Sequence, residues 1–114
     1  MYLFLNSIAE ADQPDPNQEM GDPDKTPSEE DIEKAQECRG AAAEAFSSGN
    51  VDEAIKKYTE AIKFNGGSAA YFAKRGQAYL KLNKPNACIR DCSHALQINP
   101  DSAVAFKFRG RAHR

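Results

Sequence analysis

The sequence of 114 residues has no tryptophan, only two histidines and no long apolar run. Its apolar opening covers residues 1–5 and has no basic flank, whereas a membrane span needs roughly 18 apolar residues. We therefore expect neither a signal peptide nor a membrane anchor. The three cysteines form no CxxC pair, which argues against a disulfide framework or a zinc knuckle and favours reduced thiols in a cytoplasmic protein.

Basic residues are scarce near the start of the chain, and acidic residues are scarce near its end. Residues 1–34 carry ten acidic and two basic side chains, residues 35–68 five and four, and residues 69–114 two and nine. The net charges of these segments are therefore −8, −1 and +7, although the whole chain has a net charge of only −2. This asymmetry is the first sign of a basic surface.

The acidic start is also poor in apolar residues. Residues 1–26 include Pro14, Pro16 and Pro23, and such a composition cannot bury enough apolar area to offset the ordering of the backbone. It predicts a disordered acidic linker over residues 1–26. Helix is predicted to begin where Thr26 acts as the cap, with Pro27 at the first position and Glu29 reaching back to Thr26.

Sliding the sequence against itself by 34 residues aligns small and aromatic residues in shared columns. These columns join Ala35 with Ala69 and Ala103, Ile55 with Ile89, Ala61 with Ala95, Phe72 with Phe106, and Gly76 with Gly110. A helical repeat of 34 residues is the tetratricopeptide (TPR) period. The pattern predicts an all-α TPR superhelix over residues 27–114, with repeat 1 at about 35–68, repeat 2 at about 69–102 and a partial repeat 3 at 103–114.

The helices of this array are predicted from caps and breaks. They run to about residue 47, from 51 to the glycine break at 66–67, over 69–82, over about 85–97, and from 103 onward. We expect Tyr58, Phe72, Tyr79 and Phe106 to fill the spaces between successive helix pairs. Because the third copy lacks its second helix, we predict that the last helix frays around Phe106 and Phe108.

Few residues could carry chemistry. Cys88 and Cys92 stand one helical turn apart with His94 nearby, which suggests metal, but their columns match the packing positions Ala54 and Tyr58. We therefore favour buried thiols and expect both histidines to lie at the surface. No Ser-His-Asp set, glycine-rich phosphate loop or paired-carboxylate motif occurs, so we expect no enzymatic activity, no metal and no cofactor.

The first helix of each repeat is expected to line the inner, concave face of the superhelix. The side chains predicted there for partner binding are Arg39, Lys74, Gln77, Lys81, Lys107, Arg111 and Arg114. Val104 and Phe108 are expected to line the same face. Such a cationic cradle suits an acidic partner. The alternative is that these lysines and arginines are simply the solvated face of the helices. The basic stretch 107–114 lacks the aromatic platform of an RNA-binding fold, so no nucleic acid is expected.

Several stretches within the repeats resemble the Hip family, co-chaperones that interact with the seventy-kilodalton heat-shock cognate chaperone. They are FAKRG at 72–76, KLNKPNACIRDC at 81–92, INPDSA at 98–103 and FKFRGRAHR at 106–114, and QEMGD at 18–22 resembles the acidic lead-in of that family. The resemblance implies binding of the chaperone's ATPase domain and stabilisation of its ADP state. The family's N-terminal dimerisation segment has no match here, so we expect a monomer or weak self-association and no membrane partner.

Two alternatives stay open. A TPR chain of this kind can be a generic interaction scaffold, or a truncated paralogue with another acidic partner. Other TPR co-chaperones grip acidic chaperone tails with a carboxylate clamp, but the clamp positions here hold Arg39, Ala43, Lys74, Val104 and Phe108, which retain little of the expected Lys and Asn set. Tail binding by that route is not expected. Whether the acidic lead-in folds onto the basic face is also open.

Overall fold

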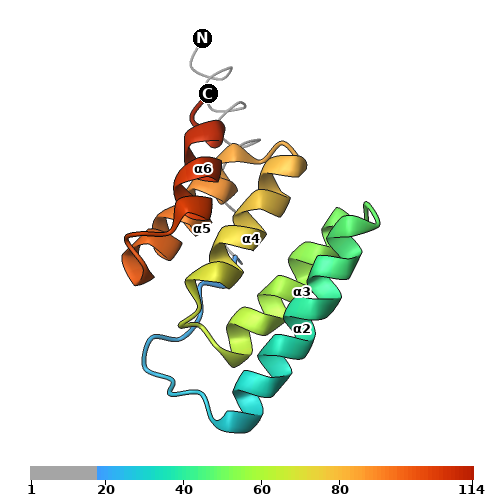
Figure 1. Cartoon of the computed structure of the whole chain (residues 1–114), viewed down its shortest axis with the longest axis vertical. Helices are drawn as coiled ribbons and strands as arrows, with labels where there is room; N and C mark the ends of the chain where they lie inside the picture. The colour runs from blue at the N-terminus through green and yellow to red at the C-terminus, as the bar shows by residue number, and fades with distance from the viewer. Residues whose placement is uncertain (1–17) are drawn as a thin grey trace, which may run out of the picture.

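The computed structural model describes residues 18–114, and within this range it contains five α-helices and no strand. The helices are α2 (Glu29–Ser47), α3 (Val51–Phe64), α4 (Ala69–Lys81), α5 (Pro85–Ile98) and α6 (Ala103–Ala112). They follow one another as hairpins, α2 with α3 and α4 with α5, and α6 packs on both α4 and α5 (Figure 1). The predicted all-α helical-hairpin fold is confirmed.

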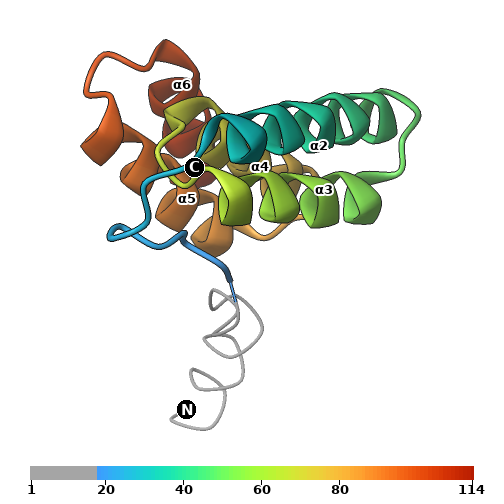
Figure 2. The same cartoon turned by 90° about the horizontal axis from the view of Figure 1, so that it is seen from below.

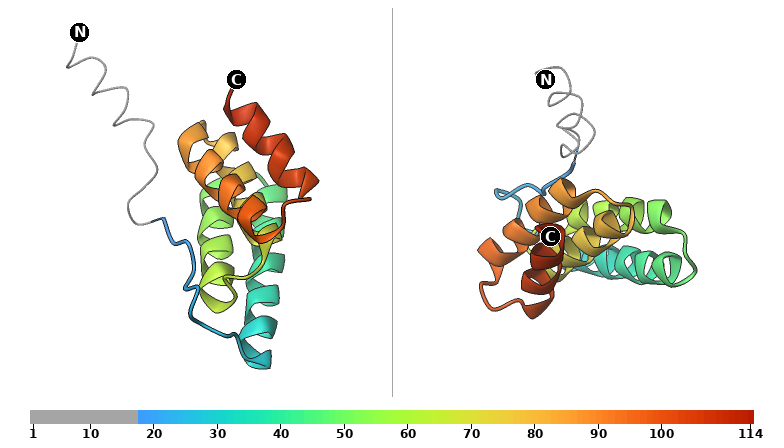
Figure 3. Two further views of the ribbon diagram at one scale, coloured as in Figure 1. Left: turned by 90° about the vertical axis from the view of Figure 1, so that its left-hand side faces the viewer. Right: turned by 90° about the horizontal axis from the view of Figure 1, so that it is seen from above.

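The helices form two sides. In Figure 2, α2 and α6 lie on one side and α3 and α5 on the other, and Figure 3 shows the same separation from two further directions. Short connections turn the chain between helices. Gly49 (φ +84°) and Asn83 (φ +60°) take the left-handed backbone conformation that glycine and asparagine tolerate best. Among residues 18–114, no helix combines the length and apolarity needed to cross a membrane.

Small residues hold the helices close together. Ala35, Ala61, Ala95 and Ala105 are completely buried, and a β-carbon built at Gly76 of α4 would lie 2.8 Å from Cys92 Sγ of α5. Of the four aromatic side chains expected between the pairs, Tyr58, Phe72 and Tyr79 are buried as predicted. The prediction is wrong for Phe106, which is 52% exposed, because α6 turns Ala105 and Phe108 toward its neighbours instead.

The first described helix begins two residues later than the sequence predicts. Its N-cap is Ser28, whose Oγ accepts the Asp31 N–H at 3.1 Å, while an Asp31 carboxylate oxygen accepts the Ser28 N–H at the same distance. This reciprocal capping box satisfies two backbone donors that a Thr26 cap would leave open. The expectation that Thr26 caps the helix is therefore wrong, and α2 starts at Glu29.

The acidic segment before α2 also differs from the prediction. The part of the predicted disordered linker at residues 1–17 lies outside the described residues. At residues 18–25 the prediction is wrong, because Gln18 is buried against α5 and Met20 packs on the main core cluster. These contacts hold the start of the segment against α3 and α5, which lie on the other side of the molecule from α2 and α6 (Figure 2).

A candidate binding groove

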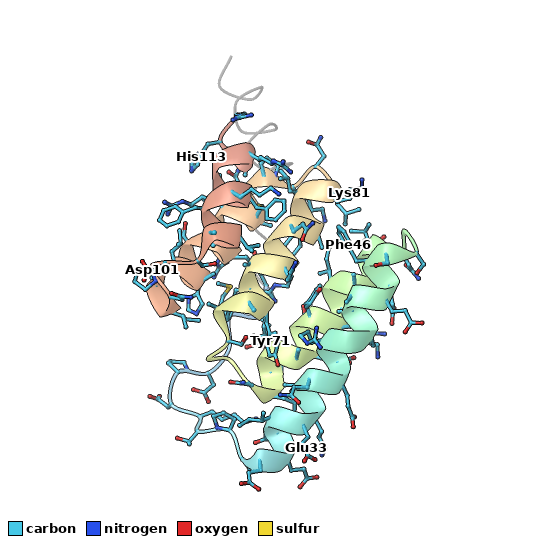
Figure 4. The ribbon with its side chains drawn as sticks, viewed as in Figure 1. Glu33, Phe46, Tyr71, Lys81, Asp101 and His113 are labelled. Atoms are coloured by element: carbon cyan, nitrogen blue, oxygen red, sulfur yellow. The ribbon has the colours of Figure 1, made fainter. Side chains whose placement is uncertain are left out.

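A depression of about 360 Å³ lies between α2 and α4. Arg39 of α2 and Lys74 and Gln77 of α4 line it, and Tyr71 and Tyr58 contribute to its walls. Arg39, Lys74 and Gln77 share this site because residues three or four apart lie on one face of a helix, and α2 and α4 turn those faces toward each other. Figure 4 shows Tyr71 in the space between the two helices.

A second depression of about 330 Å³ continues from the first toward α6. Its charged lining comes from Lys81 of α4 and Arg111 of α6, and its apolar lining from Leu80 and Phe108. Phe46 of α2 and Gln77 of α4 line both depressions, so the two form one continuous surface. We call it the basic groove. Phe46 and Lys81, which both line the second depression, lie close together in Figure 4.

The groove combines positive charge with an apolar floor. Its lining includes four cations, Arg39, Lys74, Lys81 and Arg111, and no aspartate or glutamate. Burial raises the pKa of Tyr58 and of Tyr71, and the nearby Arg39 guanidinium acts in the opposite direction. Such a surface attracts anionic segments over a distance, and it can receive an apolar side chain at Phe46 or Phe108 once they arrive.

The seven predicted partner-binding residues do not all meet in the groove. Arg39, Lys74, Gln77, Lys81 and Arg111 line it. Lys107 lies beside it, with its ammonium 5.4 Å from the centre of the Phe108 ring, and Arg111 approaches the same ring at 5.5 Å. Arg114 follows the end of α6 and is exposed without lining either depression, and Val104 likewise takes no part.

Sequence reasoning placed Phe108 on the inner face but missed Phe46 and Tyr71, the other aromatic residues of the apolar floor. Phe46 contacts the buried cluster of Ala42, Ala54 and Tyr58 while it also lines both depressions. Tyr71 could have been found, because it lies three residues before Lys74 on the same face of α4. The position of Phe46 in the sequence gave no such signal. Phe46 lies at the edge of the apolar stripe of α2, where a side chain can contact both the core and the groove.

The cysteines and histidines lie outside this groove. Cys88 and Cys92 are buried as predicted, with their sulfur atoms 3.9 Å apart and Cys88 Sγ 3.7 Å from the Phe108 carbonyl. No cluster of three potential metal ligands occurs among residues 18–114. His113 is exposed, but the surface prediction is wrong for His94, which is partly buried with its ring 4.3 Å from that of Phe72.

Comparison with known proteins agrees with this architecture. A family model described as a TPR repeat matches residues 44–83. The Hsc70-interacting protein 1 of Drosophila melanogaster is 53% identical over 110 residues, which are 96% of this chain and 29% of that protein. The TPR repeat-containing thioredoxin TDX of Arabidopsis thaliana is 44% identical over the same shares of the two chains.

Solved structures show the same helical array. The second TPR of Spaghetti (RPAP3), bound to the HSP90 peptide SRMEEVD, superposes with a TM-score of 0.72 and 30% identity, covering 74% of this chain and 78% of that one. The chain spans only 29% of the length of the Hsc70-interacting protein 1 and of the thioredoxin TDX. It belongs to the tetratricopeptide-repeat proteins and corresponds to the repeat segment of proteins like the Hsc70-interacting proteins.

Proposed function

We propose that this chain is a co-chaperone adaptor whose basic groove binds the ATPase domain of the seventy-kilodalton heat-shock cognate chaperone and stabilises its ADP state. The observation that carries the proposal is the lining of the groove, which has four cations and no carboxylate above an apolar floor. The 53% identity to a protein named for its interaction with Hsc70 supports the choice of partner. The proposal places a non-catalytic chain in the cytoplasm, as a monomer or with weak self-association.

A folded domain suits this groove better than a chaperone tail. A tail ends in a free carboxylate, which needs paired amides and cations to hold it. Here Ala43 contributes a methyl group to the depression that holds Arg39 and Lys74, and Phe108 is 7% exposed and packs in the core. The cations of the groove are therefore spread along its length and do not converge on one point, where they could hold a terminal carboxylate.

The test is calorimetric titration of the chain into the isolated ATPase domain, once with ADP and once with ATP. We expect tighter binding with ADP. Lys74→Glu replaces a positive charge in the groove by a negative one. We expect this change to weaken binding at least about tenfold, because an attraction to the acidic partner becomes a repulsion. Lys56→Glu is the matched control, because Lys56 is exposed on α3 and does not line the groove.

A second candidate is binding of an acidic chaperone tail, which one specific observation favours. The structurally similar second TPR of Spaghetti is bound to the HSP90 peptide SRMEEVD. Titrating that peptide into the same chain separates the two functions. Binding of the peptide with no heat from the ATPase domain would overturn the ATPase-domain proposal in favour of the tail. No heat from either ligand, with helicity intact by circular dichroism, would leave a scaffold for another acidic partner.

A further inference from the structure

Residues 18–25, which we call the strap, cross the side of the molecule formed by α3 and α5 (Figure 2). The strap has no regular secondary structure of its own beyond a turn near its end. It is nevertheless anchored by a side chain that is only 6% exposed, Gln18, and by Met20, which packs against the main core cluster. These buried contacts indicate a specific binding surface for the strap on α3, α4 and α5.

The Gln18 amide recognises two acceptors on α5. Its Nε2 donates to an Asp91 carboxylate oxygen at 2.7 Å and to the Ala87 carbonyl at 3.3 Å. Because both partners only accept, the NH₂ group must face them, and a glutamate in its place would set one carboxylate against another. The receptor therefore selects the amide over the isosteric acid.

The carboxylate that receives Gln18 is itself held by α4. Arg75 donates from Nε and Nη2 to the two Asp91 oxygens, both at 2.7 Å, and neither side chain of this pair is exposed. Arg75 Nη2 also lies 3.5 Å from the Met20 sulfur, and Nη1 donates to Thr59 Oγ1 of α3 at 3.2 Å. Side chains from three helices thus converge on one buried ion pair, and the strap contributes the remaining contacts.

The backbone of the strap is shaped to the same surface. Gly21 has φ +79°, and a β-carbon built there would lie 3.1 Å from the Gly66 Cα atom, so a side chain at this position would push the strap away from the α3–α4 connection. Lys25 Nζ then donates to the Lys63 carbonyl at the end of α3 at 3.1 Å. Side-chain chemistry at Gln18 and Met20 and close backbone approach at Gly21 specify one docked register.

We propose that this face of α3, α4 and α5 is a peptide-binding site for Gln-x-Met-Gly segments, built around the Arg75–Asp91 ion pair, and that the strap is its resident ligand. The site is separate from the basic groove and does not depend on the function proposed for it. The strap lies against α3 and α5, on the other side of the molecule from α2 and α6 (Figure 2).

We expect the docking to be exchangeable. Among the described residues, no donor reaches the buried Gln18 Oε1 atom. A buried acceptor without a partner disfavours the docked state, which offsets part of the gain from the two Nε2 contacts. The strap is also tethered to the array, so its effective concentration at the site is on the order of millimolar. A free segment of the same sequence must therefore reach similar concentrations to compete.

The first test compares Gln18→Glu with Gln36→Glu, which makes the same chemical change at an exposed position of α2. Nuclear magnetic resonance measures amide hydrogen exchange of each ¹⁵N-labelled chain. We expect exchange at residues 19–22 to accelerate about tenfold or more in Gln18→Glu alone, because the like charges of Glu and Asp91 expel the strap. Unchanged exchange in Gln18→Glu would overturn the proposal.

A peptide of residues 18–26 is then added at millimolar concentration. We expect it to shift the amide resonances of Ala87 and Asp91 in the Gln18→Glu chain, whose site is vacant, but not in the unmodified chain, whose site is filled. The same peptide with Glu in place of its glutamine is expected not to bind. Failure of the first peptide to bind, or equal binding of both peptides, would contradict recognition of the amide.

A double variant tests the direct contact. Gln18→Glu with Asp91→Asn exchanges the amide and the carboxylate between strap and receptor, and it keeps one negative charge beside Arg75. We expect this pair of changes to restore slow exchange in the strap, and no recovery would count against the contact. If circular dichroism shows that Gln18→Glu unfolds the chain, Met20→Ala provides an uncharged way to loosen the strap, with the same peptide as the probe.

Discussion

Arg75 of α4 and Asp91 of α5 form a bidentate ion pair from which solvent is completely excluded. Burial raises the pKa of the Asp91 carboxyl, and the hydrogen bonds from Arg75 and Gln18 act in the opposite direction. A buried pair of this kind adds little net stability compared with an apolar pair of similar size, because both charges lose their hydration. Removal of one partner, however, leaves the other charge buried without a counter-ion, and this strongly destabilises the folded state.

Asp91→Ala is therefore expected to destabilise the fold by about 3–5 kcal/mol, since it leaves the Arg75 guanidinium buried without a counter-ion. Urea denaturation followed by circular dichroism measures the change. Replacing both partners, with Arg75→Met and Asp91→Leu, should recover a large part of the loss. Asp101→Ala is the control, because Asp101 is exposed between α5 and α6. A loss for Asp91→Ala no larger than for this control would show that the pair is not isolated from water.

Gly76 and Gly110 occupy the same column of the 34-residue repeat but differ in their surroundings. A β-carbon at Gly76 would lie 2.8 Å from Cys92 Sγ and 3.3 Å from the Cys88 carbonyl, whereas nothing lies within 4 Å of one at Gly110. Gly76→Ala should destabilise the fold by about 1–3 kcal/mol by forcing α4 and α5 apart. Gly110→Ala should be neutral or slightly stabilising, because alanine is the better helix former. Equal thermal shifts in the two variants would contradict close packing at Gly76.

The start of α2 offers a test of the corrected helix cap. Ser28→Ala removes the hydroxyl that accepts the Asp31 N–H, and a lost N-cap of this kind costs about 1 kcal/mol. Thr26→Ala, two residues earlier, should leave stability unchanged, since Thr26 is exposed and precedes the capping box. Thermal unfolding of both variants decides between them. A larger effect at Thr26 would restore the cap predicted from the sequence.

His94 is expected to make stability depend on pH. Burial lowers its pKa, with Arg75 and Arg90 acting in the same direction and Asp91 opposing them. The unfolded chain therefore takes up the proton first as the pH falls, so stability is lost as the pH drops through the ordinary histidine range near about 6.5.

The measurement is urea denaturation of the unmodified chain and of His94→Gln at about pH 7.5 and about pH 5.5, on either side of the ordinary histidine pKa. We expect the drop in stability between these values to shrink in His94→Gln. The matched change His113→Gln should leave the drop as it is, because His113 is exposed. A drop of the same size in all three chains would assign it to other groups.

Much of the fold follows from local patterns. The 34-residue columns, the glycine and proline breaks and the apolar stripes predict where all five described helices begin, and where the first four end, to within two residues. They also place Arg39, Lys74 and Lys81 on one surface, because residues on the inner face of successive hairpins must face the same way. Repetition makes these predictions reliable, since each copy repeats the contacts of the one before it.

Two of the errors, at Phe106 and Gln18, occur where repetition ends. Phe106 shares a column with buried Phe72, yet it is 52% exposed, because none of the described helices covers the outer side of α6. Gln18 lies before the first repeat, so no column predicts its partner, and its polar neighbours suggest a linker. Its hydrogen bond to Asp91 spans 73 positions in the chain. Nothing in the spacing of either residue signals that contact.

The helical-repeat architecture and the basic character of the inner face follow from the sequence alone, because both depend on periodic patterns and on charge counts within single helices. The tertiary structure was needed to show which cations form one groove, that Phe46 lines both of its depressions, and that the strap is bound to the ion pair of α4 and α5. Those features depend on how separate helices meet, and the burial of Gln18 and Asp91 depends on contacts that no local pattern encodes.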